Sequence, residues 1–236
     1  MSHVSLAFAV APLAVLDGLA DLDERLFLWI NAGLHQLHSE EVESALQVLN
    51  QLGNAWTLLP LLAVLLALLP GVAARLRFFE VALPQVIASA FVSWSKRALG
   101  RPRPMTALAD AFRDEHAFAA FGEASKRNSL PSGHAATAFA FAVVLWAWAG
   151  RLPPGPRRVV ARVLPFVLAV GTGVGRVFAG QHFPGDVLAG ALAGIASALL
   201  VLAILGRLPP WRREREALAA GRPLGGGPLR GPSPTT

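Results

Sequence analysis

The sequence predicts an all-α, polytopic membrane protein, a helix bundle with about six transmembrane helices. Of its 236 residues, 54% are hydrophobic and only 15% are charged, whereas soluble domains carry about 25% charged residues. The apolar residues are also gathered in runs of about 20, the length that a helix needs to cross the hydrocarbon core of a bilayer. One domain is the expected organisation for a chain of this length.

Five apolar runs qualify as spans, and a sixth is interrupted. The five cover about Trp56–Ala74, Phe78–Ser95, His134–Ala149, Val159–Val177 and Val187–Leu205. The sixth, about Val4–Ala20, contains Pro12 and Asp17. Glu80 lies inside the second run, and such a residue persists in a span when it faces other helices rather than lipid.

The remaining segments are expected outside the hydrocarbon core. Segment 21–54 has apolar residues at roughly helical spacing, which predicts either an amphipathic helix at the interface or a helix packed over the bundle. Residues 96–133 are expected to form an active-site loop. The chain from 217 to 236 is rich in Gly, Pro and Arg, so it is predicted to be a disordered tail after a transmembrane domain at 1–216.

Arginine distribution predicts the orientation in the membrane. Arginines gather at one set of span ends, at Arg75, Arg77, Arg151, Arg157, Arg158, Arg162, Arg207, Arg212, Arg213 and Arg215. By the positive-inside rule this side, with the C-terminus, is cytoplasmic. The net charge of +6 is therefore assigned to lipid headgroups and orientation rather than to nucleic acid, which we do not expect as a partner.

The first of three polar motifs follows the second span. Lys96 and Arg103 stand seven positions apart across a Gly-Arg-Pro-Arg-Pro turn, whose prolines favour extended or turn backbone. The turn could bring the ammonium and the guanidinium together, where they would bind phosphate oxygens. The alternative is a basic flank that reaches toward headgroups, and this is the interpretation for Arg97 and Arg101.

The second motif, Pro131-Ser132-Gly133-His134, precedes an apolar run. Ser132 suits a helix N-cap, and the free N–H groups of the following turn form an anion site with the helix dipole. Gly133 permits close approach of the backbone to a phosphate, and the His134 imidazole would lie near the same anion. A routine helix cap followed by an incidental histidine is the alternative.

The third motif places Arg176 at the end of one span, His182 in the following turn and Asp186 at the start of the next span. Pro184 suits a helix start, so the histidine and the carboxylate can adjoin. A carboxylate on one imidazole nitrogen leaves the other free as base or nucleophile. A structural His–Asp pair is the alternative. All three motifs fall on the same predicted, non-cytoplasmic side, which favours one shared phosphate site.

The spacing Lys96-x6-Arg103-Pro104, Pro131-Ser132-Gly133-His134 and Arg176-x5-His182-x3-Asp186 resembles the three-part signature of the type-2 phosphatidic acid phosphatase superfamily. The motifs cover residues 96–186, and the six-span pattern extends the resemblance over most of the chain. One position departs from the family. The third motif often begins Ser-Arg, whereas this chain has Gly175 before the arginine, so one hydroxyl donor to phosphate is missing.

The resemblance implies catalysis through a phosphohistidine. It assigns His182 as the nucleophile, Asp186 as the group that orients its ring, and His134 as the acid that protonates the leaving oxygen and then activates water. The groups expected to bind the phosphoryl oxygens are Lys96, Arg103, Ser132, Gly133 and Arg176. We expect no metal and no other cofactor, because three cations take the place of a metal and the chain has no cysteine and no carboxylate cluster suited to magnesium.

The sequence therefore predicts an integral membrane hydrolase that acts on a lipid phosphate or diphosphate. Undecaprenyl diphosphate is the first choice, because short six-span bacterial members of the family commonly recycle this carrier. That choice places the chain in a bacterial cytoplasmic membrane, with its site facing the periplasm or the cell exterior.

Several alternatives remain open. Within enzymes they are a phosphatidylglycerophosphate or phosphatidic acid phosphatase and a lipid phosphotransferase. Outside enzymes they are a lipid-binding scaffold and a small transporter, for which the indication is Glu80 within a span. The expected partners are the lipid substrate and the bilayer, and the sequence leaves the oligomeric state undetermined.

Overall fold

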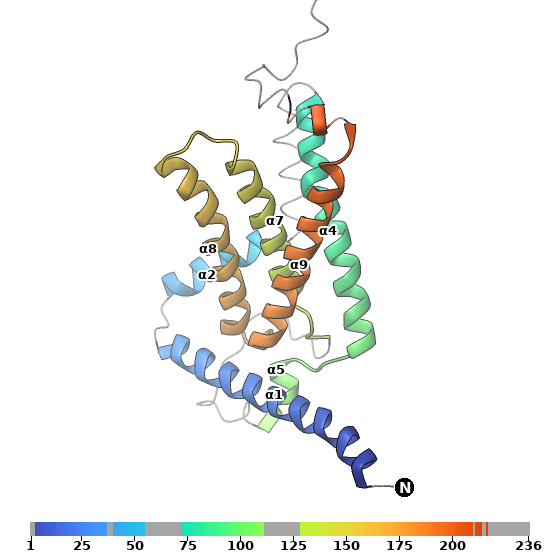
Figure 1. Cartoon of the computed structure of the whole chain (residues 1–236). Coiled ribbons are helices and arrows are strands. Elements are labelled where there is room, and N and C mark those ends of the chain that lie inside the picture. The colour runs from blue at the N-terminus through green and yellow to red at the C-terminus, as the bar shows by residue number, and fades with distance from the viewer. Residues whose placement is uncertain are drawn as a thin grey trace, which may run out of the picture.

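The computed structural model describes residues 3–36, 40–54, 72–110, 128–209, 211–213 and 216. These residues form helices and no strands: α1 (His3–Gln36), α2 (Glu40–Leu52), α4 (Val72–Leu99), α5 (Pro104–Ala107), α7 (Gly133–Ala149), α8 (Pro156–Phe178) and α9 (Pro184–Leu205). Four long helices, α4, α7, α8 and α9, form the bundle, and α7 packs against the other three (Figure 1). The predicted all-α fold is confirmed.

Three segments of the described chain are long and apolar enough to cross a membrane, namely Leu76–Ala107, Pro156–Phe178 and Pro184–Leu205. The 17 residues of α7 are also apolar but form a shorter helix. Each of these helices begins within a few residues of the start of the matching expected span. This agreement arises because an apolar run long enough to cross the bilayer marks the position of a spanning helix. Most of the expected span Trp56–Ala74 and all of the tail 217–236 lie outside the described residues.

The outer surface of the bundle is apolar. Its exposed large side chains include Phe91, Trp94, Val163, Val167, Leu192 and Leu199. Apolar patches of this extent are unfavourable in water and are expected where lipid covers the surface.

The N-terminal region differs from the sequence-based expectation. A span at Val4–Ala20 and a separate segment at 21–54 are predicted, but α1 is one continuous helix across the boundary between them. The residues just after that boundary are mostly good helix formers, so nothing there ends the helix. The rest of the 21–54 segment forms α2, which packs against α8, while α1 lies across one end of the bundle (Figure 1).

The second half of α1 packs against the bundle with one face. Phe27 is fully buried and meets the ring of Phe183 with their centroids 5.4 Å apart. Asn31 Nδ2 donates to two carbonyl oxygens in the last turn of α8, both at 3.0 Å. Trp29, on the other face, is 75% exposed. This half of α1 thus packs against the bundle with one face and leaves the other face exposed, and its expected position at the membrane interface stays a prediction.

Two glycines of α9 let it approach α7 closely. A Cβ at Gly190 would lie 2.2 Å from the carbonyl oxygen of Ser132, and a Cβ at Gly194 would lie 2.1 Å from that of Ala136. Small residues four positions apart allow helix backbones to meet in this way. The contact places the start of α7 beside the second and third turns of α9.

Glu80 lies at the opposite end of the bundle and is 3% exposed. Its carboxylate accepts hydrogen bonds from Arg77 Nη1 at 3.1 Å and from Trp148 Nε1 at 2.5 Å, and it lies 3.7 Å from Arg151 Nη2. A buried carboxylate requires such partners. These contacts give Glu80, the residue that indicated a transporter, a structural role.

Candidate active site

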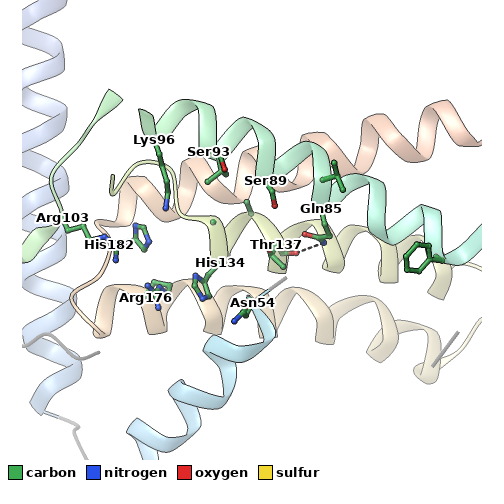
Figure 2. Close-up of a pocket in the computed structure, with 16 residues that line it drawn as sticks. Asn54, Gln85, Ser89, Ser93, Lys96, Arg103, His134, Thr137, Arg176 and His182 are labelled. Atoms are coloured by element: carbon green, nitrogen blue, oxygen red, sulfur yellow. Dashed lines mark hydrogen bonds between the residues drawn. The ribbon is translucent and has the colours of Figure 1, made fainter. Parts of the chain in front are cut away.

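The three motifs meet at one end of the bundle, where α4 and α8 end and α7 and α9 begin (Figure 1). A cavity of about 780 Å³ lies there. Six of the eight predicted site residues line it: Lys96, Arg103, Gly133, His134, Arg176 and His182 (Figure 2). The other two, Ser132 and Asp186, lie behind this wall and are fully buried.

Three cationic side chains surround the outer part of the cavity. Lys96 and Arg176 occupy the last turns of α4 and α8, and Arg103 follows the turn at Gly100, whose φ of 57° suits glycine. Arg103 Nη1 donates to Gln181 Oε1. Among the described residues, the buried Nε atoms of both arginines have no hydrogen-bond partner. Unpaired guanidinium donors beside an ammonium are suited to an anion with several oxygens.

The start of α7 forms a second wall of the cavity. Ser132 is its N-cap, with Oγ accepting from Ala135 N–H at 3.4 Å, and its own N–H donates to the Asp186 carbonyl oxygen at 2.9 Å. Gly133 and His134, in the first turn, face the cavity. The structure therefore gives Ser132 a capping role, and its predicted contact with phosphate stays a prediction.

His182 lies between α8 and α9 and is 1% exposed. Its Nδ1 is 3.5 Å from Asp186 Oδ2, at the long end of hydrogen-bond contact. The carboxylate is held by its own helix, because Oδ2 also accepts from Phe183 N–H at 3.0 Å. With Nδ1 directed at the carboxylate, Nε2 is the free nitrogen of the ring.

Burial lowers the pKa of His182 to about 4. The charges of Arg176 and Arg103 lower this pKa further, whereas the hydrogen bond and the charge of Asp186 oppose the shift. The imidazole is therefore neutral at pH 7 and keeps a lone pair on Nε2. A neutral, oriented imidazole beside three cations has the properties of a nucleophile toward an anionic phosphorus centre.

Sequence reasoning missed three residues that hold Asp186 or its partners. Ser129 Oγ donates to Asp186 Oδ2, and Arg101 Nη1 pairs with Oδ1 at 2.7 Å. Asp23 of α1 lies 2.8 Å from Arg101 Nη2. The interpretation of Arg101 as a flanking charge is wrong, because its guanidinium binds two carboxylates and lies 4.2 Å from the Phe183 ring centroid. One sequence feature could have indicated this role: Arg101 falls on the predicted non-cytoplasmic side, where few positive charges are expected.

The cavity continues between α4 and α7, away from the charged side chains. Its inner lining includes Gln85, Ser89, Ser93, Thr137 and Asn54 (Figure 2). None of these polar residues belongs to the three motifs, so no sequence pattern indicated them as site residues.

Within the described ranges, no group of three or more His, Asp or Glu side chains is arranged to hold a metal ion. The expectation of a metal-independent reaction stays a prediction.

Comparison with protein families decides the classification. Residues 78–209 match the model of the PAP2 superfamily, and these residues contain all three motifs. The chain belongs to the PAP2 superfamily. The resemblance that the motif spacing indicates is thereby confirmed.

Curated relatives of this PAP2 protein carry two kinds of name. A lipid A 1-phosphatase of Rhizobium johnstonii is 35% identical over 132 residues, which are 55% of this chain and 47% of that protein. The putative undecaprenyl-diphosphatase YbjG of Escherichia coli is 32% identical over 171 residues, which are 69% of this chain and 78% of that protein. The match thus spans about half the length of the Rhizobium protein.

Solved PAP2 structures share the fold. Aquifex aeolicus LpxE matches with a TM-score of 0.59 and 26% identity, covering 76% of this chain and 93% of that one. A transmembrane PAP2 type phosphatidylglycerolphosphate phosphatase from Bacillus subtilis matches with a TM-score of 0.62, covering 89% and 98%. Its identity is 22%, so it supports the fold alone. The polytopic membrane architecture is confirmed.

Proposed function

We propose that this chain hydrolyses a lipid phosphate or diphosphate through a phosphohistidine intermediate. The observation that carries the proposal is the position of His182, which is neutral, oriented by Asp186 and placed in the wall of a cavity with three cations. The unpaired Nε donors of Arg103 and Arg176 support an anionic substrate. The phosphatase names of the relatives support the same reaction class.

In the first step, His182 Nε2 attacks phosphorus and forms a P–N bond while the P–O bond to the leaving group breaks. The leaving oxygen takes a proton from His134. Lys96, Arg103 and Arg176 bind the phosphoryl oxygens, over which negative charge is spread in the transition state. The positive charge that develops on the His182 ring is balanced by Asp186.

In the second step, water attacks the phosphorus of phosphohistidine. His134, now neutral, accepts a proton from this water, and the P–N bond breaks and returns its electron pair to His182 Nε2. Inorganic phosphate leaves, and both histidines regain their starting protonation states. The sum of the two steps is the hydrolysis of one phosphate ester or anhydride bond by one water molecule.

The decisive experiment compares phosphate release by the purified wild type and His182→Ala in detergent. The variant is expected to lose at least about a thousandfold in kcat, because the nucleophile is absent. With a substrate whose leaving group departs without a proton, His134→Ala should instead accumulate a phosphoryl group on His182, detectable by mass spectrometry of peptides kept at neutral pH. Turnover by His182→Ala near that of the wild type would refute the mechanism, and binding of lipid phosphate without any turnover would identify a scaffold.

The substrate is proposed only by class. Undecaprenyl diphosphate, the first choice from the sequence, is compatible with the name of the Escherichia coli relative, and the name of the Rhizobium relative indicates lipid A 1-phosphate instead. Phosphate release should be measured side by side on both lipids and on phosphatidylglycerophosphate. A kcat/KM for a diacyl or lipid A phosphate above that for undecaprenyl diphosphate would overturn the ranking. Product analysis in labelled water would reveal a phosphotransferase.

We also propose that the site faces the non-cytoplasmic side of a bacterial membrane. The chain has no cysteine, so single cysteines report topology without background. Thr106→Cys, at an exposed position of α5, should react with an impermeant thiol reagent on intact cells. Pro154→Cys, in the exposed turn between α7 and α8, should react only after permeabilisation. The reverse pattern would invert the topology.

A further inference from the structure

A second cavity lies between α7 and α8, toward the end of the bundle where α7 ends and α8 begins, opposite the three motifs (Figure 1). Its volume is about 450 Å³. It shares no lining residue with the catalytic cavity. One cation and five apolar side chains line it: Trp146, Arg162, Val163, Phe166, Val167 and Val170. We call this cavity the α7–α8 groove.

The α8 wall of the groove is a stripe along one face of the helix. Arg162, Phe166 and Val170 stand four positions apart, which places them above one another on that face. Val163 and Val167 complete the stripe and are 53% and 57% exposed. Eight residues lead from the arginine to the last valine, which is about 12 Å along the helix axis. The groove therefore runs from a cation near the helix end to an apolar surface at the middle of the span.

The cation is fixed in place at the mouth of the groove. Arg162 Cζ lies 4.9 Å from the centroid of the Trp146 ring. A Cβ at Gly150, the residue that caps α7, would lie 3.0 Å from Arg162 Nη2. In the part of the chain that the structure describes, no carboxylate forms an ion pair with this guanidinium, and its Nε has no hydrogen-bond partner. The charge of Arg162 is thus held in one position without an anion from the protein.

A second cation lies one turn away on the same face. Arg158 precedes Arg162 by four positions and is half-buried. Like charges at this spacing repel one another, so an anion between the two guanidinium groups would relieve the repulsion. A phosphodiester supplies such an anion, and basic pockets between transmembrane helices bind anionic headgroups in this way. A zwitterionic headgroup is less favourable, because its ammonium would also lie near two cations.

We propose that the α7–α8 groove binds one anionic phospholipid of the surrounding bilayer. Its phosphodiester lies between Arg158 and Arg162, and one acyl chain follows Val163, Val167 and Val170. This lipid is a bound partner and not the substrate, because a diester such as phosphatidylglycerol has no terminal phosphate to release. By contacting α7 and α8 together, it stabilises the pair of helices that carry His134 and Arg176. The inference does not depend on the proposed function.

The test measures lipid binding to the purified full-length chain in detergent. Native mass spectrometry counts the bound molecules as dioleoyl phosphatidylglycerol or dioleoyl phosphatidylcholine is added, and thermal unfolding is followed with each lipid. The acyl chains of the two lipids are identical, so a difference in affinity reports the headgroup. The wild type should bind phosphatidylglycerol about tenfold more tightly, as expected for one charge-assisted hydrogen bond, and its unfolding temperature should rise more with this lipid.

Two variants test the two parts of the groove. Arg162→Gln should bring the affinity ratio of the two lipids close to one, because the fixed cation is absent. Val167→Trp should fill the apolar part and weaken the binding of both lipids while every charge is kept. If Arg162→Gln does not fold, Arg158→Gln should lower the ratio by removing the other cation of the same face.

Two controls assign the binding to this groove. Arg157→Gln removes an exposed neighbouring charge that does not line the groove and should keep the ratio within about twofold. Arg103→Gln removes a cation from the catalytic cavity and should also keep the ratio, which separates this site from the substrate site.

Three results would overturn the proposal. The first is equal affinity of the wild type for the two lipids. The second is a preference for phosphatidylglycerol that survives Arg162→Gln and is lost in Arg103→Gln, which would place the lipid in the catalytic cavity. The third is a dimer in lipid-free detergent that Val167→Trp dissociates, which would assign the groove to a second copy of the chain.

Discussion

Arg101 Nη1 and Asp186 Oδ1 lie 2.7 Å apart, and this ion pair joins the turn after α4 to the first turn of α9. Arg101 Nη2 also contacts Asp23 Oδ2 of α1 at 2.8 Å, and Asp23 Oδ1 accepts from Gly185 N–H at 2.7 Å. Three segments that are distant in sequence are thereby held around the carboxylate that orients His182. The Arg101–Asp186 ion pair therefore helps to position the nucleophile and also stabilises the fold.

Replacing Arg101 should therefore impair both activity and stability. In Arg101→Met the fully buried Asp186 loses its cation, and breaking a buried ion pair from one side costs on the order of 3 kcal/mol. We expect a lower thermal unfolding temperature and a decrease in kcat of at least about tenfold. Arg97→Met is the matched control, because Arg97 lies in the same motif and is exposed. Equal behaviour of the two variants would contradict the role of the pair.

Asp23 should act on catalysis through Arg101 although it lies on α1. Asp23→Asn weakens the hold on the guanidinium, so kcat should fall several-fold with little change in KM. Asp21→Asn should have no effect, because the Asp21–Arg25 pair at 2.9 Å is exposed and such pairs contribute little. In the Arg101→Met background, Asp23→Asn should cause no further loss. Additive losses of kcat would show that Asp23 acts independently.

The lowered pKa of His182 predicts a dependence of stability on pH. The pKa is about 4 in the folded protein against 6.5 ordinarily, so between these values the unfolded chain binds a proton that the folded protein does not. Stability should therefore fall as the pH drops from 6.5 to 4, by roughly 3 kcal/mol from this group. His182→Asn lacks this titration. The unfolding temperature of the wild type relative to the variant should decrease over this range, and a constant difference would refute the shift.

The spans, and the cationic and histidine side chains of the cavity, could be predicted from the sequence because both are local patterns. Apolar runs of fixed length mark α4, α8 and α9, and the spacing of the motifs brings Lys96, His134 and His182 to helix ends. The partners of Asp186 could not be predicted in this way. Arg101 and Asp23 reach one another only through the path of α1 across the bundle, which no local spacing encodes.

The continuity of α1 and the position of Gln85 were missed for a related reason. A proline and a charge inside an apolar run indicate a break from sequence alone, whereas α1 continues through both. The polarity of Gln85 is visible in the sequence, but its orientation depends on the neighbouring α7. Tertiary packing decides both features.

The close contact between α7 and α9 gives a last prediction. In Gly190→Ala the new Cβ would lie 2.2 Å from the Ser132 carbonyl oxygen, so the two helices must separate. Separation would lengthen the 2.9 Å hydrogen bond from Ser132 N–H to the Asp186 carbonyl oxygen and move His134 away from the cations. We expect a lower unfolding temperature and a loss of kcat of more than about tenfold, because overpacking a close helix contact forces backbone shifts.

Gly33→Ala is the matched control for this change. Gly33 lies inside α1, and a Cβ there would have no neighbour within 4 Å, so alanine should leave activity unchanged and raise stability by up to about 1 kcal/mol. Thermal unfolding and phosphate release measured on both variants in the same detergent separate steric overlap from the general effect of removing a glycine. If Gly190→Ala were as stable and as active as Gly33→Ala, the close approach of α7 and α9 would not be what aligns Ser132 and His134 with Asp186.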